Sequence, residues 1–322
     1  MALLGAELFR SDAFETLTQC PSCAGTELRS EGRQRDNLFG IPTLWELSGC
    51  KRCDLVFVNP RPAQNDLGHA YEVLFPGGAD GPSAAAPQQP ALALLRLWHW
   101  VNGSSSFQAR FIPPGAGQTI LDVGCGMGAL GSALKRRGYK VLGVELNRTQ
   151  WATAERSGVE VVGQTLFDAE LKPDSLDAIV YSHVIEHLPE PGRELEQATK
   201  YLRSGGRVYI ACPNYKGFQR RLFGAAWHNW HLPFHLTHFS PHSLRHLFEA
   251  SGLHVISISE ESPVHFAMAS WRTRSSATPC EAWDDVTRHV GPPWQRAGLG
   301  LLLRVLALGL GGDHLVGIAA KP

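Results

Sequence analysis

Four cysteines near the start of the chain have the spacing of a metal site. They form two C-x-x-C pairs, Cys20 with Cys23 and Cys50 with Cys53. Each such pair folds as a tight knuckle that aims two thiolates at one point, and two knuckles complete the tetrahedral site that zinc prefers. Because four sulfur ligands leave no open position, we expect this Zn²⁺ to be structural rather than catalytic. Ordinary buried or strand-end positions are expected for the other three cysteines: Cys125, Cys212 and Cys280.

A glycine-rich turn in the middle of the chain has the composition of a ligand-binding loop. Leu121-Asp122-Val123 reads as a buried strand that runs into Gly124-Cys125-Gly126-Met127-Gly128 and then a helix. Glycines let a ligand touch the backbone, and the helix points its first N–H groups at that ligand. Glu145 ends the next strand, where a carboxylate can accept both hydroxyls of a ribose. The spacing also fits a dinucleotide fingerprint, so a dehydrogenase using NAD(P) is an alternative.

Histidines supply the candidate bases, because an imidazole within hydrogen-bond reach of an acceptor can take its proton. His183 and His187 lie four residues apart, and we predict that they share a face on the first turn of a helix. His235 and His238 belong to an aromatic and histidine-rich loop over residues 227–239. For His187, helix-start hydrogen bonding is the favoured reading. A second metal site from His231, His235 and His238 is an alternative, although a hydrogen-bonded loop is favoured.

The elements that position these residues alternate between strand and helix. Strands are predicted at 119–123, 140–144, 159–162, 177–181 and 206–211, with helices at 129–137, 148–157 and 191–203. Such alternation predicts an α/β fold with a doubly wound parallel sheet and helices on both faces. Ligands bind at the carboxyl ends of such strands, where the glycine-rich turn, Glu145 and Ser182-His183 all fall. A further helix is predicted from Pro241, capped by Ser240 and ended by Gly252.

The motifs that follow the glycine-rich turn occur in a recognisable order. They are Phe167-Asp168, Ser175 to Val180, His183 to Pro189, and Leu202 to Ile210. In this order they resemble the class I S-adenosylmethionine-dependent methyltransferases, from Thr119 to Asn214. The resemblance implies a seven-stranded, mostly parallel sheet whose sixth strand is at 255–259 and whose seventh, at 314–321, is inserted antiparallel.

The same resemblance implies roles for individual residues toward S-adenosylmethionine. Asp122 and the turn residues Gly124, Cys125, Gly126 and Gly128 would hold its methionine part, and Glu145 its ribose. Leu146 would pack on the adenine, whose edge would meet Thr165, Leu166 or Asp168. Turn hydrogen bonding is an equal alternative for Asp168. Ser182 and His183 would face the sulfonium and the acceptor.

The two knuckles and the run Leu55-Val56-Phe57-Val58-Asn59-Pro60-Arg61-Pro62 look like the head of methyltransferases from bacterial polysaccharide and natural-product pathways. The run from Pro233 to Phe239 resembles the substrate-covering insertion of the same group. Three parts are expected: a zinc-ribbon-like domain at 1–75, a linker and helical lid at 76–118, and a catalytic domain at 119–322 with insertions at 213–240 and 260–312. Zinc-bearing sugar C-methyltransferases are partly similar, but they carry an extra C-terminal domain.

Charge and hydrophobicity limit the range of partners. The 322 residues have a formal net charge of zero, and residues 1–75 hold seven Lys and Arg against ten Asp and Glu, a net of minus three. Phosphate binding needs the opposite sign, so nucleic acid is disfavoured. No signal peptide or transmembrane segment is evident, since the apolar stretch 299–310 is short and contains Arg304. We therefore expect a cytoplasmic protein, in which a helix at 297–310 packs on the sheet or forms a homodimer contact.

These observations predict a zinc-ribbon-headed methyltransferase that acts on a small-molecule or glycan biosynthetic intermediate, at oxygen and with a histidine base. The alternatives are a sugar or other C- or N-methyltransferase, an rRNA or tRNA methyltransferase, an NAD(P)-dependent dehydrogenase, and a zinc-ribbon interaction module without enzymatic activity.

Overall fold

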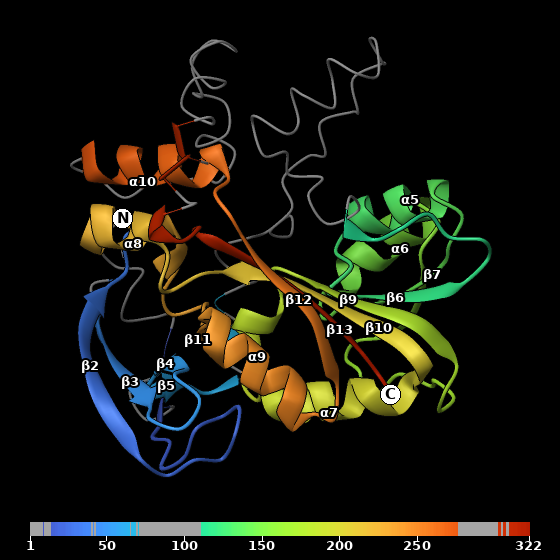
Figure 1. Ribbon diagram of the computed structural model, residues 1–322, viewed down its shortest axis with the longest axis horizontal. Coiled ribbons are helices and arrows are strands. Elements are labelled where there is room, and N and C mark those ends of the chain that lie inside the picture. Colours follow the sequence, from blue (N-terminus) through green and yellow to red (C-terminus); the bar gives the residue numbers. More distant parts are fainter. Residues whose placement is uncertain are drawn as a thin grey trace.

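The computed structural model describes residue 9, residues 14–70 except 40, 42, 65 and 69, residues 111–275, and residues 302–303, 305–306 and 309–322. The described chain is built around a seven-stranded sheet and a four-stranded sheet. In Figure 1 the four-stranded sheet lies at the left and the larger sheet extends to the right. Cys280 and most of the predicted lid and of the predicted helix at 297–310 fall outside the described residues.

The larger sheet has the strand order β12-β13-β10-β9-β6-β7-β8. Strands β8, β7, β6, β9 and β10 run parallel, and β13 is antiparallel to both of its neighbours. The predicted seven-stranded, mostly parallel sheet is therefore confirmed. Its strands are β6 (Thr119–Val123), β7 (Lys140–Val144), β8 (Glu160–Gly163), β9 (Leu176–Ser182), β10 (Leu202–Pro213), β12 (His254–Glu261) and β13 (His314–Ala320).

Helices cover both faces of this sheet because successive strand residues point to opposite sides. Val180 packs with Leu134 of α5 (Ala129–Arg136), in a core that also contains residues of α6 (Arg148–Arg156). The next residue, Tyr181, belongs to a second core with Leu195 of α7 (Pro191–Tyr201) and Leu247 of α9 (Pro241–Ala250). The strand order reverses direction around β6, so the carboxyl ends of β6, β7 and β9 flank a topological switch point, where such sheets bind ligands.

The segment after β9 departs from the sequence prediction. His183 and His187 do not share a helix, because only Ile185–His187 forms a single 3₁₀ turn, η1. His183 lies before this turn with φ 56°, in the left-handed region that non-glycine residues rarely adopt. Its N–H donates to the carbonyl of Ala211 at 2.8 Å, continuing the β9–β10 ladder. Because of this bond the helical turn begins only at Ile185, and the two histidine side chains contact different neighbours.

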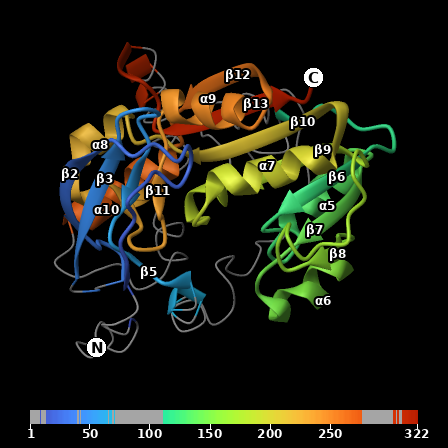
Figure 2. The ribbon, with the colours of Figure 1, turned by 90° about the horizontal axis from the view of Figure 1, so that it is seen from below.

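The smaller sheet joins two segments that are far apart in the chain. Strands β2 (Leu28–Arg35), β3 (Leu44–Cys50) and β4 (Val56–Val58) form an antiparallel meander. Strand β11 (Thr237–His238) pairs antiparallel with β4, so the aromatic loop at 227–239 completes the N-terminal sheet. Strands β1 (Phe14–Glu15) and β5 (Arg61–Pro62) pair separately. Figure 2 shows this sheet at the opposite end of the molecule from α5 and α6.

The N-terminal unit is packed directly on the larger sheet and its helices. Cys20, Cys50 and Cys53 share a buried core with residues of β6, β9, α7 and α9. Arg61 is 7% exposed, and its guanidinium donates to the carbonyl of Pro189, just before α7. A Cβ on Gly192, in the first turn of α7, would lie 2.2 Å from the carbonyl oxygen of Ser22. The first knuckle is therefore in direct contact with α7.

The other described helices lie in or near the aromatic loop. The helix α8 (Phe218–Phe223) and the 3₁₀ turn η2 (Gly224–Ala226) precede it, and the 3₁₀ turn η3 (His228–Trp230) lies within it. The helix α10 (Val264–Ser275) packs against η3. Within the described ranges, no helix combines the length and apolar character needed to cross a bilayer.

Candidate functional site

The glycine-rich turn connects β6 to α5 in a conformation that only glycines adopt easily. Gly124, Gly126 and Gly128 have φ values of 66°, 53° and 84°. A Cβ on Gly124 would lie 2.6 Å from the side chain of Val184, and one on Gly128 would lie 3.0 Å from the backbone of Ala154. The turn is thus packed closely on its protein side, and side chains at these positions would force it open.

Glu145 follows β7 and reaches the tip of this turn. One carboxylate oxygen accepts the N–H of Gly126 at 2.9 Å, and the other accepts the N–H of Asn147 at 2.7 Å. Asp122, at the end of β6, is 2% exposed beneath the turn. The structure therefore brings the predicted ribose ligand and the predicted methionine-binding turn together at the switch point, with a half-buried carboxylate that can exchange a backbone donor for hydroxyl groups.

The residues expected at the adenine differ in what they can offer. Leu146 is 57% exposed, although it is a large apolar side chain. The side chain of Leu166 is fully buried in the core, so only its backbone can meet a ligand. Asp168 accepts the N–H groups of Gln164 and Thr165 and the hydroxyl of Thr165, which is the turn-forming role that the sequence left open for it.

Ser182 is the last residue of β9, and His183 follows it at the carboxyl end of that strand. Ser182 lines a small hollow together with Phe111, Tyr181, Ala211 and Val316. The His183 side chain is 33% exposed, with Nδ1 3.5 Å from a carboxylate oxygen of Glu186 and Nε2 3.0 Å from Nε2 of His314. Val184, the next residue, contacts the glycine-rich turn. Among the four histidines predicted to be catalytic, His183 is thus connected through its neighbour to the cofactor loop.

The other three predicted bases lie around the aromatic loop. His235 and His238 are 5% and 2% exposed, and His187 is half-buried. Burial lowers the pKa of His238 to about 3 and holds the pKa of His235 well below its usual value, with a smaller contribution from neighbouring histidines at His235. The rings of His187 and His235 are 4.6 Å apart and those of His235 and His238 are 6.3 Å apart. The structure therefore divides the candidates into one accessible histidine and an inner group of neutral ones.

Two residues that sequence reasoning missed complete this region. His314 begins β13 and is brought beside His183 by the antiparallel pairing of β13 with β10, in which it stands opposite Pro213. Asp313 is fully buried and accepts hydrogen bonds from the indole of Trp227 at 2.9 Å and the amide of Asn229 at 3.1 Å. Burial raises the pKa of Asp313 well above its usual value. No local spacing marks either residue, since both act across more than 80 positions of chain.

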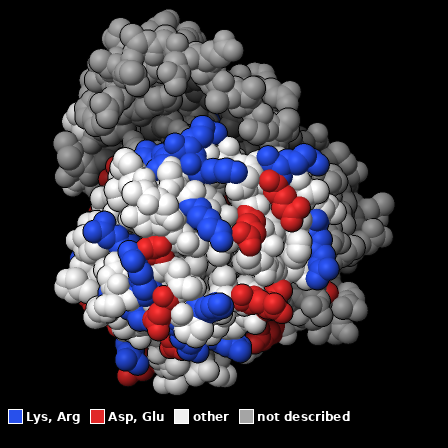
Figure 3. All heavy atoms as spheres, turned by 90° about the vertical axis from the view of Figure 1, so that its right-hand side faces the viewer, with Lys and Arg blue, Asp and Glu red and all other residues white. Residues whose placement is uncertain are grey.

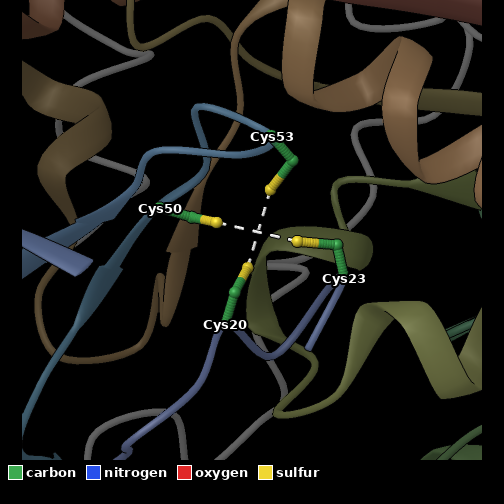
Figure 4. Close-up of side chains that lie close together, drawn as sticks. All are labelled: Cys20, Cys23, Cys50 and Cys53. Atoms are coloured by element: carbon green, nitrogen blue, oxygen red, sulfur yellow. Dashed lines mark hydrogen bonds between the residues drawn. The ribbon is translucent and has the colours of Figure 1, made fainter. Parts of the chain in front are cut away.

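The four predicted metal ligands converge (Figure 4). All four Sγ atoms lie within 4.8 Å of one another, with 3.6 Å between Cys20 and Cys53 and between Cys23 and Cys50. These separations are far too long for disulfides, whose sulfurs lie about 2.05 Å apart. In the part of the chain that the structure describes, this is the one cluster made of thiols alone.

The two knuckles have the same backbone geometry. In each, the N–H of the residue after the second cysteine donates 2.9 Å back to the carbonyl of the first, from Ala24 to Cys20 and from Asp54 to Cys50. Ala24 and Asp54 both have positive φ, at 55° and 60°. Cys20, Cys50 and Cys53 are buried, and the four sulfurs lie close enough to share one ion. The residues present therefore fit a tetrahedral zinc ion.

Comparisons with known proteins agree with this geometry. A family model described as a methyltransferase domain matches residues 95–258, just over half of the chain. A ubiquinone biosynthesis O-methyltransferase of Aeromonas salmonicida (strain A449) is 31% identical over 167 residues, which are 48% of this chain and 69% of the relative. One of Pseudomonas putida (strain W619) is 33% identical over 106 residues, 31% of this chain and 46% of the relative. The chain thus spans less than half of the Pseudomonas protein.

An S-adenosylmethionine-dependent methyltransferase from Mesorhizobium loti has a similar structure, with a TM-score of 0.47 and 16% identity, covering 69% of this chain and 100% of that one. On the family match, the strand order and the glycine-rich turn, the chain belongs to the methyltransferase domain family and is an S-adenosylmethionine-dependent methyltransferase. The dehydrogenase and non-enzymatic alternatives are therefore wrong.

Proposed function

We propose that this methyltransferase transfers a methyl group to a hydroxyl oxygen of a small-molecule or glycan intermediate, with His183 as the base. The observation that carries the proposal is the position of His183: it follows the carboxyl end of β9, is partly exposed, lies 3.5 Å from Glu186 and precedes Val184, which packs on the glycine-rich turn. The relatives named as O-methyltransferases support oxygen as the acceptor atom. C- and N-methylation are the alternatives for the same site.

Bound S-adenosylmethionine supplies a methyl group on a sulfonium, whose leaving group is neutral, so in-line placement gives most of the acceleration. In the proposed site, Gly124 to Gly128 hold the methionine part and Glu145 accepts the ribose hydroxyls. The exposed face of Leu146 covers the adenine, and the backbone of Thr165 and Leu166 meets its edge. Asp168 shapes this segment through its turn hydrogen bonds.

His183 holds the proton that a hydroxyl acceptor loses. The carboxylate of Glu186, with one oxygen 3.5 Å from Nδ1, stabilises the imidazolium that forms through its negative charge. Nε2 of His183 lies 3.0 Å from Nε2 of His314, so an acceptor hydroxyl reaches this nitrogen when the His314 ring moves aside. His235, His238 and His187 orient the aromatic loop that encloses the acceptor, rather than exchanging protons themselves.

The four-cysteine cluster is proposed to hold a structural Zn²⁺. Its ligand set is closed, and it lies in the core shared by β9 and α7. The ion would fix the knuckles against α7 and, through the pairing of β4 with β11, support the aromatic loop.

A nucleic-acid acceptor is disfavoured by charge. The formal net charge is zero, and the face at the right of Figure 1 carries Lys and Arg interspersed with Asp and Glu (Figure 3). Among the described residues of that face, charges of both signs lie side by side, whereas phosphate binding requires a single-sign basic field. A small-molecule or glycan acceptor therefore fits better than rRNA or tRNA.

Thermal unfolding with S-adenosylhomocysteine tests the cofactor site. At about 100 times its dissociation constant the ligand should stabilise the wild type by roughly 2.7 kcal/mol. Glu145→Ala should lose most of that gain, whereas Glu170→Ala, which removes an exposed carboxylate outside the site, should keep it. An equal gain in both variants would remove Glu145 from the proposed site. A wild type without any response would contradict the proposed cofactor site as a whole.

A further inference from the structure

A second group of ligand side chains connects η1 to the aromatic loop. Glu186, His187 and His235 each place one ligand atom within 4.8 Å of the others. Glu186 and His187 are adjacent in η1, and His235 comes from the loop that ends in β11. The two imidazole rings meet edge to face, 4.6 Å apart at 80°. The cluster differs from the one considered from sequence, which contained His231 and His238 and no carboxylate.

Within the described chain, no hydrogen-bond donor stabilises the buried carboxylate of this cluster. Glu186 is 1% exposed, and neither of its oxygens accepts a hydrogen bond from any described residue. The one charge partner found in the described chain is Nδ1 of His183, at 3.5 Å. A buried carboxylate without donors is costly, by several kcal/mol for an ion. A bound cation beside Glu186 would offset that cost.

The two imidazoles are already oriented as metal ligands. Nδ1 of His187 lies 3.0 Å from the carbonyl of Phe234, and Nδ1 of His235 lies 2.9 Å from the carbonyl of Asn229. Because a carbonyl can only accept, both Nδ1 atoms carry the proton and both Nε2 atoms carry a lone pair. Metal-bound histidines are held by this same outer hydrogen bond.

We propose that Glu186, His187 and His235 form a binding site for a divalent transition-metal ion, separate from the four-cysteine site. Two imidazoles and one carboxylate suit Zn²⁺, Fe²⁺ or Mn²⁺ better than Mg²⁺, which prefers oxygen ligands. With metal–ligand distances of about 2.1 Å, the side chains need to close by on the order of 1 Å. Three protein ligands leave a coordination position open. The ion links the aromatic loop to η1, whose ligand Glu186 is three residues from His183.

Metal uptake by the full chain, loaded first with Zn²⁺ at the cysteines, tests this proposal. Wild type should bind a second equivalent of Zn²⁺, measured by calorimetry and elemental analysis. Glu186→Gln and His235→Gln should bind only the first. The matched control is His238→Gln, which alters an equally buried histidine of the same loop outside the ligand group. It should keep the second equivalent.

Cobalt distinguishes the two sites without any substitution. Co²⁺ added to the zinc-loaded wild type should give weak visible bands of nitrogen and oxygen coordination, without the intense near-ultraviolet charge transfer of thiolate ligands. A wild type that takes up no second ion overturns the proposal even if every variant fails to fold. A second ion with thiolate charge transfer, or one retained at full affinity by both folded ligand variants, also overturns it.

Discussion

The proposed cofactor end and the proposed acceptor end of this site are built in different ways. At the ends of β6 and β7, Asp122, the glycine-rich turn and Glu145 lie within 24 consecutive residues and offer mostly backbone. At the ends of β9 and β10, His183, Glu186, His235 and His314 come from three distant segments and are mostly buried. The comparison suggests that a local motif suffices to hold a constant cofactor. The proposed acceptor residues are instead brought together by long-range packing, to which the cysteine knuckles contribute through the shared core.

Cys50→Ser tests the support of the acceptor end and should have the largest effect. Cys50 is fully buried in the core shared with β9 and α7, so losing it removes a proposed zinc ligand and leaves a buried polar group. We expect loss of zinc and a fall in unfolding free energy of more than about 3 kcal/mol. Zinc content and urea unfolding measure both. Cys212→Ser, also fully buried but outside the cluster, should keep the zinc; equal zinc in the two variants would contradict the assignment.

His183→Ala should separate the two ends functionally. Removal of a general base costs about 10²–10⁴ in kcat, while the cofactor end is left intact. S-adenosylhomocysteine formation with a panel of hydroxyl acceptors, together with S-adenosylhomocysteine affinity, measures the two quantities. His242→Ala, at an exposed position on α9, is the control. If His183→Ala weakened cofactor affinity as much as turnover, the division into two ends would not hold.

Glu194 makes the stability of the folded protein depend on pH. Burial beneath β9 raises the pKa of this carboxyl from 4.5 to about 7, and the hydroxyl of Tyr181, at 3.4 Å, offsets part of the rise. The folded state therefore binds the proton more tightly than the unfolded state. Its contribution to stability is complete below pH 4.5 and is lost as the pH rises to about 7, by about 3 kcal/mol in all. Beyond that pH the contribution is constant.

Glu194→Gln should remove this dependence, because the amide does not titrate. Urea unfolding between pH 5 and 8 compares the two proteins: relative to the variant, the wild type should lose stability as the pH rises. Glu196→Gln, in the same helix at an exposed position, should behave as the wild type does. Parallel stability curves for wild type and Glu194→Gln would show that Glu194 ionises normally.

Leu146→Ala should have the smallest effect, confined to the cofactor end. The side chain is 57% exposed, so its loss should leave stability unchanged, but an adenine that covers it would lose about 1 kcal/mol of contact. We expect S-adenosylhomocysteine to bind roughly fivefold more weakly by calorimetry. Leu222→Ala, at a position 55% exposed on α8, should leave the affinity unchanged. A matching loss in both variants would argue against adenine contact at Leu146.

The conformation of the glycine-rich turn and the place of Glu145 could be predicted because that information is local. The alternation of strands and helices, the positive-φ glycines at Gly124, Gly126 and Gly128, and Glu145 at the end of β7 all follow from spacing within one βαβ unit. Convergence of the four thiols follows likewise from the C-x-x-C geometry. The capping box of Ser240 and Ser243 at the start of α9 is another local feature, with Ser240 predicted as the cap.

By itself, the sequence determined the fold class, the methyltransferase family and the supply of histidines near the acceptor. Tertiary structure alone decided which histidines meet. The β9–β10 ladder holds His183 outside η1, the antiparallel pairing of β13 brings His314 beside it, and the pairing of β4 with β11 carries His235 toward Glu186. Such contacts join residues dozens of positions apart. No periodicity encodes them, since they depend on how whole strands pair.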